Sequence, residues 1–380
     1  MREVPTGVHD TLMDWIREAQ AAGAKDSALS RVLFPARSHR LTVPHTVDPA
    51  LHPVFAERLL RVPEAYVGVI PGGRFWADKD DAAAVITPDN KLIRDVSLNF
   101  LIPDWPHPVF RRRQLGEPMH RAETVAVVTF VWSRNYFHWM TDVIGRIRLL
   151  EASGLSIDKY IIAGGETAPF QLETLAMLGI GPERIIRANE GLHLQAERLV
   201  VPSLRPYRLL PFTVNPLPRW SVEYMRERLT QAVRPEPLGG YERIYISRGD
   251  AKHRRVLNEP DVVRLLAAHG FRTVALSGMK VAEQIRLFAS ARTIVAPHGA
   301  SLTNLMFCRP GTRVVDIFAP NYMYPCFWHI SSYTGLDYYY LIGQGRRLTA
   351  QEGVGLVGHV HDDLTVDLAQ LAAMLRLLGP

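Results

Sequence analysis

Apolar and polar positions divide the chain into short strands and amphipathic helices. Residues 125–130 form a continuous apolar run, which is typical of a strand buried on both faces. A helix is predicted at about 136–152, and strands and helices then alternate as far as residue 201. Because alternating strands and helices build parallel sheets, this part of the chain predicts an α/β fold.

A second alternating series begins at residue 243 and ends in an amphipathic helix at 364–378. Five prolines between residues 202 and 218 separate the two series, since proline removes backbone donors and interrupts regular elements. We therefore expect two domains, residues 1–215 and 216–380. The other elements expected in the second domain are strands at 243–246, 273–276, 293–296, 314–318 and 338–341, and helices at about 259–269, 281–289 and 302–307.

The start of the chain has weaker patterns. A short helix is predicted at 9–22, a strand at 66–70, and a hairpin from strands 83–87 and 91–96 around a Pro-Asp-Asn turn. Residues 34–64 are rich in proline and histidine and are expected to be loop with short strands. The N-terminal domain is thus predicted to begin with a β-rich portion.

Four basic side chains and a histidine fall between residues 248 and 255, directly after a predicted strand. Arginine offers paired donors that suit phosphate oxygens, and like charges crowded in one loop repel one another. We predict a phosphate site with Arg248 as its first ligand, Arg255 as its second, and Lys252 beside them. A solvated loop of ordinary surface charges is the alternative. Asn258 is interpreted as a structural cap of the following helix.

A second candidate site is the turn His298-Gly299-Ala300 between a predicted strand and a helix. Small residues let a ligand approach the backbone, and the helix start offers N–H groups and partial positive charge to a diphosphate. A neutral imidazole can donate to a phosphate or a sugar hydroxyl; alternatively, it caps a carbonyl in an ordinary turn. The residues assigned to donor binding from this turn and its surroundings are Glu283, His298, Gly299, Ala300, Ser301, Thr303 and Asn304.

His138 and Asp142 lie four residues apart near a helix start, so they share one face. A carboxylate beside an imidazole orients it and raises its basicity, and either group can take a proton from an acceptor hydroxyl. We predict that this pair supplies a general base, with Asp142 slightly favoured. A packing pair beside two aromatic residues is the alternative.

The composition narrows the class of protein. The chain is 47% apolar and 22% charged, as in ordinary globular proteins, and its 380 residues suffice for two cores. The net charge of +6 suits an anionic ligand, nucleic acid or an anionic membrane surface, although a generally basic surface fits as well. The basic segment lacks interleaved aromatic residues, so nucleic acid is not expected as a partner.

Cellular location and metal content are predicted from a few features. Two isolated cysteines argue for a reducing compartment and against a zinc cluster. No apolar run has the length of about 18 residues that a membrane helix needs, and the start does not resemble a signal peptide. We expect a cytoplasmic location and leave peripheral attachment to the inner face of the membrane open. The aromatic run 338–340, expected to be exposed, leaves a homodimer open. Asp78-Lys79-Asp80 could hold a metal, but a surface acid cluster is preferred.

Five short motifs follow one another between residues 130 and 320. They are Asn135-Tyr136-Phe137-His138-Trp139 with Asp142, Tyr245-Ile246-Ser247-Arg248, Arg254-Arg255-Val256 with Asn258 and Glu259, Glu283-Gln284-Ile285, and Pro297-His298-Gly299-Ala300 with Leu302, Thr303 and Asn304. In this order they resemble glycosyltransferase family 61. The resemblance implies an α/β, GT-B-like fold: two Rossmann-like domains facing a cleft, with a C-terminal helix that crosses back to the N-terminal domain. It also implies a nucleotide-sugar donor and inversion at the anomeric carbon, with no metal or other cofactor.

The predicted function is an inverting, metal-independent glycosyltransferase. The C-terminal domain would bind a nucleotide-sugar, UDP-linked by analogy with better-known family members, and fixed cations would neutralise the leaving group. The N-terminal domain would bind a glycan or lipid-linked glycan acceptor and supply the base. The resemblance connects such enzymes with capsule or other surface polysaccharides. A nucleotide- or polysaccharide-binding module without turnover is the rival interpretation.

Overall fold

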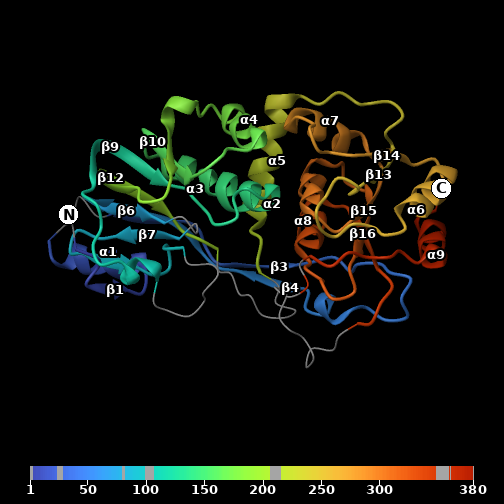
Figure 1. The fold of residues 1–380 in the computed structure, drawn as a ribbon, viewed down its shortest axis with the longest axis horizontal. Helices are drawn as coiled ribbons and strands as arrows, with labels where there is room; N and C mark the ends of the chain where they lie inside the picture. The colour runs from blue at the N-terminus through green and yellow to red at the C-terminus, as the bar shows by residue number, and fades with distance from the viewer. Residues whose placement is uncertain are drawn as a thin grey trace. The chain divides into compact units, whose positions relative to one another are not determined.

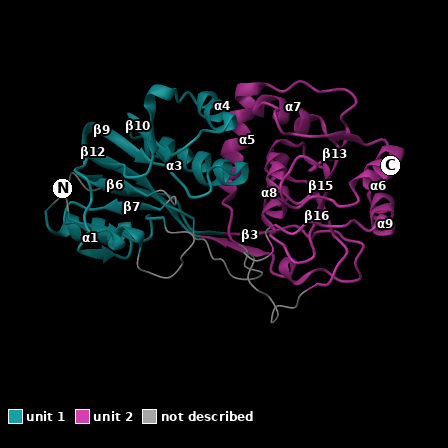
Figure 2. Cartoon of the chain, viewed as in Figure 1, with its two compact units in different colours: residues 1–37, 63–205 teal, residues 38–62, 206–380 magenta. Residues whose placement is uncertain are grey.

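The chain folds into two units, each with its own β-sheet (Figure 2). Unit 1 contains residues 1–37 and 63–205, and unit 2 contains residues 38–62 and 206–380. The sequence prediction of domains 1–215 and 216–380 did not assign residues 38–62 to the second unit. The computed structural model describes residues 3–23, 29–78, 82–98, 107–205, 215–347, 359 and 361–379.

The parallel part of the unit 1 sheet has the strand order β11-β10-β9-β12 (Figure 1). β9 (Met119–Val127) pairs parallel with β10 (Lys159–Ala163) on one side and with β12 (His193–Pro202) on the other, and β10 pairs with β11 (Ile185–Ala188). β9 comes first along the chain, so the strand order reverses between β9 and β12. Ligands of open α/β sheets bind beyond the carboxyl ends of the strands at such a point.

The β-rich start of unit 1 completes the same sheet with antiparallel strands, except that β1 pairs parallel with β8. β12 pairs with β5 and β6, and β7 pairs with β8, which confirms the predicted hairpin. Helix α1 (Leu12–Ala21) begins at Thr11, whose hydroxyl accepts from the N–H of Asp14 at 3.0 Å. The strands of this part are β1 (Gly7–His9), β2 (Leu29–Phe34), β5 (Ala65–Pro71), β6 (Arg74–Ala77), β7 (Ala83–Ile86) and β8 (Lys91–Ile93).

The helix predicted at 136–152 is present as three consecutive segments: α2 (Tyr136–His138), a π-helix, η3 (Trp139–Ile144), and α3 (Gly145–Ser153). Asn135 caps the first segment, because its side-chain oxygen accepts from the N–H of Phe137 at 2.9 Å. π-Helices are rare and occur frequently at functional sites. The remaining helical segments of unit 1 are η2 (Pro108–Arg111), α4 (Pro169–Met177) and η4 (Pro182–Arg184).

Unit 2 is built on a wholly parallel sheet with the strand order β14-β13-β15-β16-β17. β13 comes first along the chain, so the order reverses between β13 and β15. The five predicted strands are all present, with shifts of a few residues at their ends. They are β13 (Arg243–Ile246), β14 (Arg272–Val274), β15 (Thr293–Pro297), β16 (Arg313–Phe318) and β17 (Asp337–Ile342).

Helices cover both faces of this sheet, as in doubly wound α/β folds (Figure 1). α6 (Glu259–Ala268) and α9 (Leu368–Leu378) lie on one face. α5 (Arg219–Val233), α7 (Val281–Ser290) and α8 (Cys326–Thr334) lie on the other. The segment after β15, predicted to be an α-helix, is a 3₁₀ helix, η5 (Ala300–Phe307).

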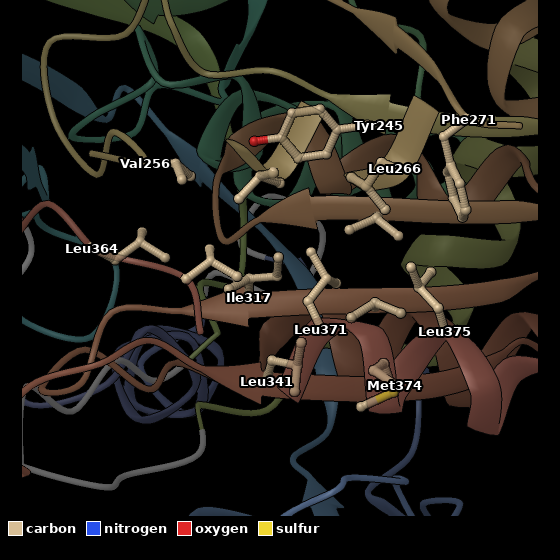
Figure 3. Close-up of a cluster of buried hydrophobic side chains, with 14 of the residues drawn as sticks. Tyr245, Val256, Leu266, Phe271, Ile317, Leu341, Leu364, Leu371, Met374 and Leu375 are labelled. Carbon is tan, nitrogen blue, oxygen red and sulfur yellow. The ribbon is translucent and has the colours of Figure 1, made fainter. Parts of the chain in front are cut away.

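The last helix, α9, belongs to the core of unit 2 (Figure 3). Leu371, Met374 and Leu375 are buried in one apolar cluster with Leu266 of α6 and Ile317 of β16. Burying each of these side chains contributes on the order of 1.5–3 kcal/mol. The prediction that this helix crosses back to the N-terminal domain is therefore wrong. Its amphipathic pattern shows that one side must be buried, but not against which partner.

The segment leading into α9 is tied to the start of α6 through Asn258. This residue stands at the helix start as predicted, but its side chain does not cap the helix. Its amide donates to the carbonyl of Val366 at 2.9 Å and accepts from the N–H of Val366 at 3.0 Å. Asn258 therefore has a structural role, although not the one expected from its position.

Residues 38–62 form part of unit 2, through a two-stranded sheet and a buried aromatic side chain. β3 (Arg37–Arg40) pairs with β4 (Leu59–Val62). Between them Phe55, at the end of η1 (Pro53–Phe55), packs on Tyr340 with ring centroids 4.5 Å apart. Tyr340 and Tyr338 are almost fully buried. The expectation of an exposed aromatic run at 338–340 is therefore wrong, and with it the argument for a homodimer.

None of the helices in the described ranges combines the length and the apolar character needed to cross a bilayer.

Candidate functional site

The first candidate site lies where the strand order of unit 2 reverses, at the carboxyl ends of β13 and β15. The basic loop follows β13, and the turn at residues 298–299 follows β15. The Nε of Arg254 donates to the carbonyl of His298 at 3.1 Å. The structure therefore brings together the two segments that were both predicted to bind the donor.

Arg248 is held within the basic loop by backbone groups. Its Nε donates to the carbonyl of Arg254 at 3.2 Å, and its Nη2 donates to the carbonyl of His253 at 2.9 Å. The carboxylate of Glu259 accepts from the hydroxyl of Ser247 at 3.0 Å and so fixes the start of the loop. Burial and the charge of Arg254 together lower the pKa of Arg248 to about 10. The guanidinium still carries its charge at neutral pH.

Gly299 provides the space that the Arg248 side chain occupies. A Cβ atom at position 299 would fall on the guanidinium, within 3.0 Å of its Cζ. The backbone of Gly299 is extended, with φ −178° and ψ 167°, so any residue could adopt its conformation. Glycine is therefore needed here for room and not for backbone freedom.

Arg254 is a site residue that the sequence analysis did not select. Its backbone is left-handed, with φ 54°, and its guanidinium lies over the ring of Tyr322 at 5.2 Å from the centroid. Arg255, which was selected, is directed elsewhere and pairs with Asp363 at 2.9 Å. Lys252 is exposed on the same loop. Arg254 and Arg255 cannot be distinguished in the sequence. In the structure their side chains point in different directions because the backbone of Arg254 is left-handed.

His298 is buried beneath the turn and bonded to a second residue that the sequence analysis missed. Its Nδ1 lies 3.0 Å from Asp316 Oδ2, and the same carboxylate accepts from the hydroxyl of Tyr338 at 2.8 Å. Burial lowers the pKa of His298, and the charge of Asp316 raises it. The positive charges of Arg254 and Arg248 lower it further, and the net shift is downward. The ring is therefore neutral, with its proton on Nδ1 and an acceptor lone pair on Nε2. In this tautomer Nε2 accepts a hydrogen bond from a hydroxyl and cannot donate one to a phosphate. The donation to phosphate that was expected from the sequence is therefore ruled out.

Two of the predicted donor-binding residues have structural partners. Asn304 donates to the side-chain oxygen of Gln284 at 2.8 Å and thereby links η5 to α7. Glu283 accepts from the N–H of Lys280 at 2.8 Å, at the start of α7. Neither contact was visible in the sequence, and both explain these side chains without a ligand.

Two hydroxyl groups next to the turn are buried without hydrogen bonds. Ser301 Oγ and Thr303 Oγ1, both on η5 after Ala300, have no partner within the part of the chain that the structure describes. A buried polar group left unsatisfied costs on the order of 1–3 kcal/mol. Both oxygens are closed off from solvent, so a ligand at the turn does not contact them in this conformation.

The second candidate site lies where the strand order of unit 1 reverses, at the carboxyl ends of β9 and β12. His138 follows β9, and its Nδ1 lies 2.9 Å from Asp142 Oδ2. Arg205 follows β12 and donates two hydrogen bonds to the same carboxylate, from Nε to Oδ1 at 2.5 Å and from Nη2 to Oδ2 at 3.0 Å. Arg205 stands at the start of the proline-rich linker, where no sequence signal connects it with Asp142.

The contacts of Asp142 decide between the two candidate bases. Burial raises the pKa of this carboxyl, but Arg205 and His138 outweigh that effect and hold the pKa below its usual value. Asp142 is also only 3% exposed, so a substrate hydroxyl cannot easily reach it. The carboxylate orients His138, whose Nε2 is the better candidate for a base. The sequence analysis had slightly favoured Asp142.

The candidate metal motif is only partly described. Asp78 forms an ion pair with Arg112, and Asp80 lies outside the described residues. Within the described ranges, no three His, Cys, Asp or Glu side chains are grouped in a way that could hold a metal ion. Cys308 and Cys326 are both buried, unbridged thiols.

Known proteins resemble part of this chain. Residues 136–315 match the model of the family described as Glycosyltransferase 61, which confirms the resemblance inferred from the motifs. A beta-1,2-xylosyltransferase from Oryza sativa subsp. japonica is 36% identical over 61 residues, which are 16% of this chain and 11% of that protein. A beta-1,2-xylosyltransferase from Arabidopsis thaliana is 31% identical over 64 residues, 17% of this chain and 12% of its own length. The matched segments are thus a small part of both relatives.

Proposed function

We propose that this protein is a glycosyltransferase that moves a sugar from a nucleotide-sugar donor to a hydroxyl group of a glycan. The match of residues 136–315 to the Glycosyltransferase 61 family supports the reaction class. The observation that carries the proposal is the meeting of Arg248 and Arg254 at the turn of His298 and Gly299. This turn lies at the point of the sheet where α/β proteins bind phosphate-bearing ligands.

The donor diphosphate is proposed to bind at this turn. Two neighbouring guanidinium groups repel each other, and a diphosphate offsets that repulsion while using their paired donors. Fixed cations stabilise the negative charge that develops on the departing diphosphate, so the proposed reaction needs no metal. The nucleotide is proposed to be UDP, as the family resemblance suggests.

The acceptor is proposed to bind at the His138 site of unit 1. The acceptor oxygen forms a bond to the anomeric carbon as the bond from that carbon to the diphosphate oxygen breaks. His138 Nε2 takes the proton of the acceptor hydroxyl, and Asp142 stabilises the imidazolium that results. A single displacement of this kind inverts the anomeric configuration. The assignment of donor and acceptor to different units follows the GT-B arrangement that the resemblance implies.

The proposal is tested by binding and turnover with one arginine removed. Arg248→Ala should weaken the binding of UDP in calorimetry much more than the binding of uridine, which has no phosphate. Wild-type protein with UDP-sugars and a glycan acceptor should release UDP and form a product of inverted configuration, assigned by NMR. A wild type that binds UDP without turnover would instead be a binding module. A role in capsule or surface polysaccharide and a cytoplasmic location stay predictions.

A further inference from the structure

An aromatic side chain beside the His138 pair is placed in an unusual way. Trp132 lies in the loop between β9 and α2, and its backbone is left-handed with φ 62°. A bulky residue in this conformation is a genuine outlier, and such strain is concentrated at functional sites. Two other non-glycine residues with positive φ have local explanations, since Asn90 is of a type that tolerates it and Arg234 ends helix α5.

The loop around Trp132 is fixed by neighbouring groups. The N–H of Asn135 donates to the carbonyl of Trp132 at 2.7 Å. The side chain of Gln171, from α4, donates to the carbonyl of Ser133 at 2.9 Å. The guanidinium of Arg146 donates to the carbonyl of Thr129 at 2.5 Å. Side chains from α4 and α3 therefore hold the loop that contains the strained residue.

The strained loop leaves part of an aromatic side chain exposed next to the candidate base. Trp132 is 38% exposed, whereas its neighbours Val131 and Ser133 are 3% and 1% exposed. It is the one exposed aromatic side chain among the residues that the structure describes. Its ring centroid lies 5.3 Å from that of His138, and Phe130 stacks on His138 at 5.7 Å. The hydroxyl of Ser133 is buried without a hydrogen-bond partner in the described ranges.

We propose that Trp132 is the platform on which a pyranose ring of the acceptor stacks, so that one of its hydroxyl groups lies near His138 Nε2. The face of an indole ring is electron-rich, and the C–H groups on one face of a pyranose carry partial positive charge. The outer edge of the sugar keeps its hydroxyl groups for hydrogen bonds. This inference rests on the proposed function, because it names the ligand that the proposed base acts on.

The test measures sugar binding without turnover. Full-length protein saturated with UDP is mixed with methyl pyranosides of glucose, galactose, mannose and xylose, and saturation-transfer NMR records contacts to ring protons. At least one pyranoside should show them in the wild type. Trp132→Ala should bind it about 2- to 12-fold more weakly, the range of one aromatic contact. Trp132→Phe should retain part of the binding. Leu172→Ala, which removes an apolar side chain 42% exposed in the same unit, should bind as the wild type does.

A glycine variant separates a binding role from a structural one. Both Trp132→Ala and Trp132→Gly lose the ring, but only glycine adopts positive φ without strain, so Trp132→Gly should lose the sugar contacts while its Tm is equal to or above that of Trp132→Ala. Unchanged sugar binding in Trp132→Ala or in Trp132→Gly would overturn the proposal. So would a wild type that contacts none of the four pyranosides. UDP binding by calorimetry should be the same in all variants, and its absence in the wild type would instead refute the proposed donor site.

Discussion

The substitution Gly299→Ala tests the donor site with a single added methyl group. That methyl would fall on the guanidinium of Arg248, and the glycine backbone itself is unstrained. The atoms that must move are the far end of a flexible side chain, so the fold can accommodate the change by displacing Arg248. The displaced guanidinium loses its contacts to the carbonyls of His253 and Arg254, at 2.9 and 3.2 Å.

The expected magnitudes differ for stability and for binding. Loss of hydrogen bonds at a partly exposed loop should lower the free energy of unfolding by about 1 kcal/mol. Loss of a charge-assisted contact to phosphate should cost roughly 1.5–3 kcal/mol, which corresponds to a Kd for UDP that is about 10- to 140-fold higher. The affinity for uridine should hardly change, because the displaced group faces phosphate.

Calorimetry with UDP and with uridine is the assay, together with thermal unfolding of each variant. Gly239→Ala is the matched control, since a Cβ at position 239 would meet no atom within 4 Å. This control should bind UDP as the wild type does. Wild-type affinity for UDP in Gly299→Ala would show that the Arg248 guanidinium is not at the phosphate site. An equal loss of affinity for UDP and uridine would point to general damage and would also refute the reasoning.

Three further outcomes are expected. Excess EDTA should leave the rate of sugar transfer unchanged. If EDTA abolished transfer and Mn²⁺ restored it, a metal site that includes Asp78 would be supported. Asp142→Asn keeps the volume and removes the charge that orients the base, so single-turnover rates should fall by about two to four powers of ten while the Kd for UDP is unchanged; a retained rate would show that the carboxylate is not needed to orient His138. His107 donates from Nε2 to the carbonyl of Leu98 and accepts at Nδ1 from the N–H of Val109, at 3.0 and 3.1 Å. Burial lowers its pKa to about 4. The unfolded chain is therefore protonated at a higher pH than the folded protein is. The free energy of unfolding falls as the pH is lowered from about 6.5 toward 4. The loss between pH 7 and pH 5 should be about 2 kcal/mol. Urea unfolding of His107→Gln should lack this part of the pH dependence, and an unchanged dependence would contradict the assignment.

The local elements and the chemistry at their ends could be predicted from the order of the amino acids. Apolar runs such as 125–130 and the repeated strand-helix alternation report which segments are buried strands, because burial acts on each side chain where it stands. The five strands of unit 2 were predicted in this way, and so were the basic loop and the turn that begins at His298. The cap of Asn135 on the next helix is equally local, since its side chain bonds the backbone two residues further on.

Contacts between residues far apart in the chain depend on how the strands are ordered in each sheet. The pattern of α9 required a buried face, but its partner on α6 lies about a hundred residues earlier in the chain. Arg205 reaches Asp142 because β12 returns beside β9, and His298 reaches Asp316 because β15 and β16 are neighbours. Arg254 and Arg255 differ only in the direction that a left-handed backbone imposes. Periodicity and spacing describe a segment and its nearest turns. The groups that set the pKa and direction of a catalytic side chain come from strand order, which depends on how the whole chain packs.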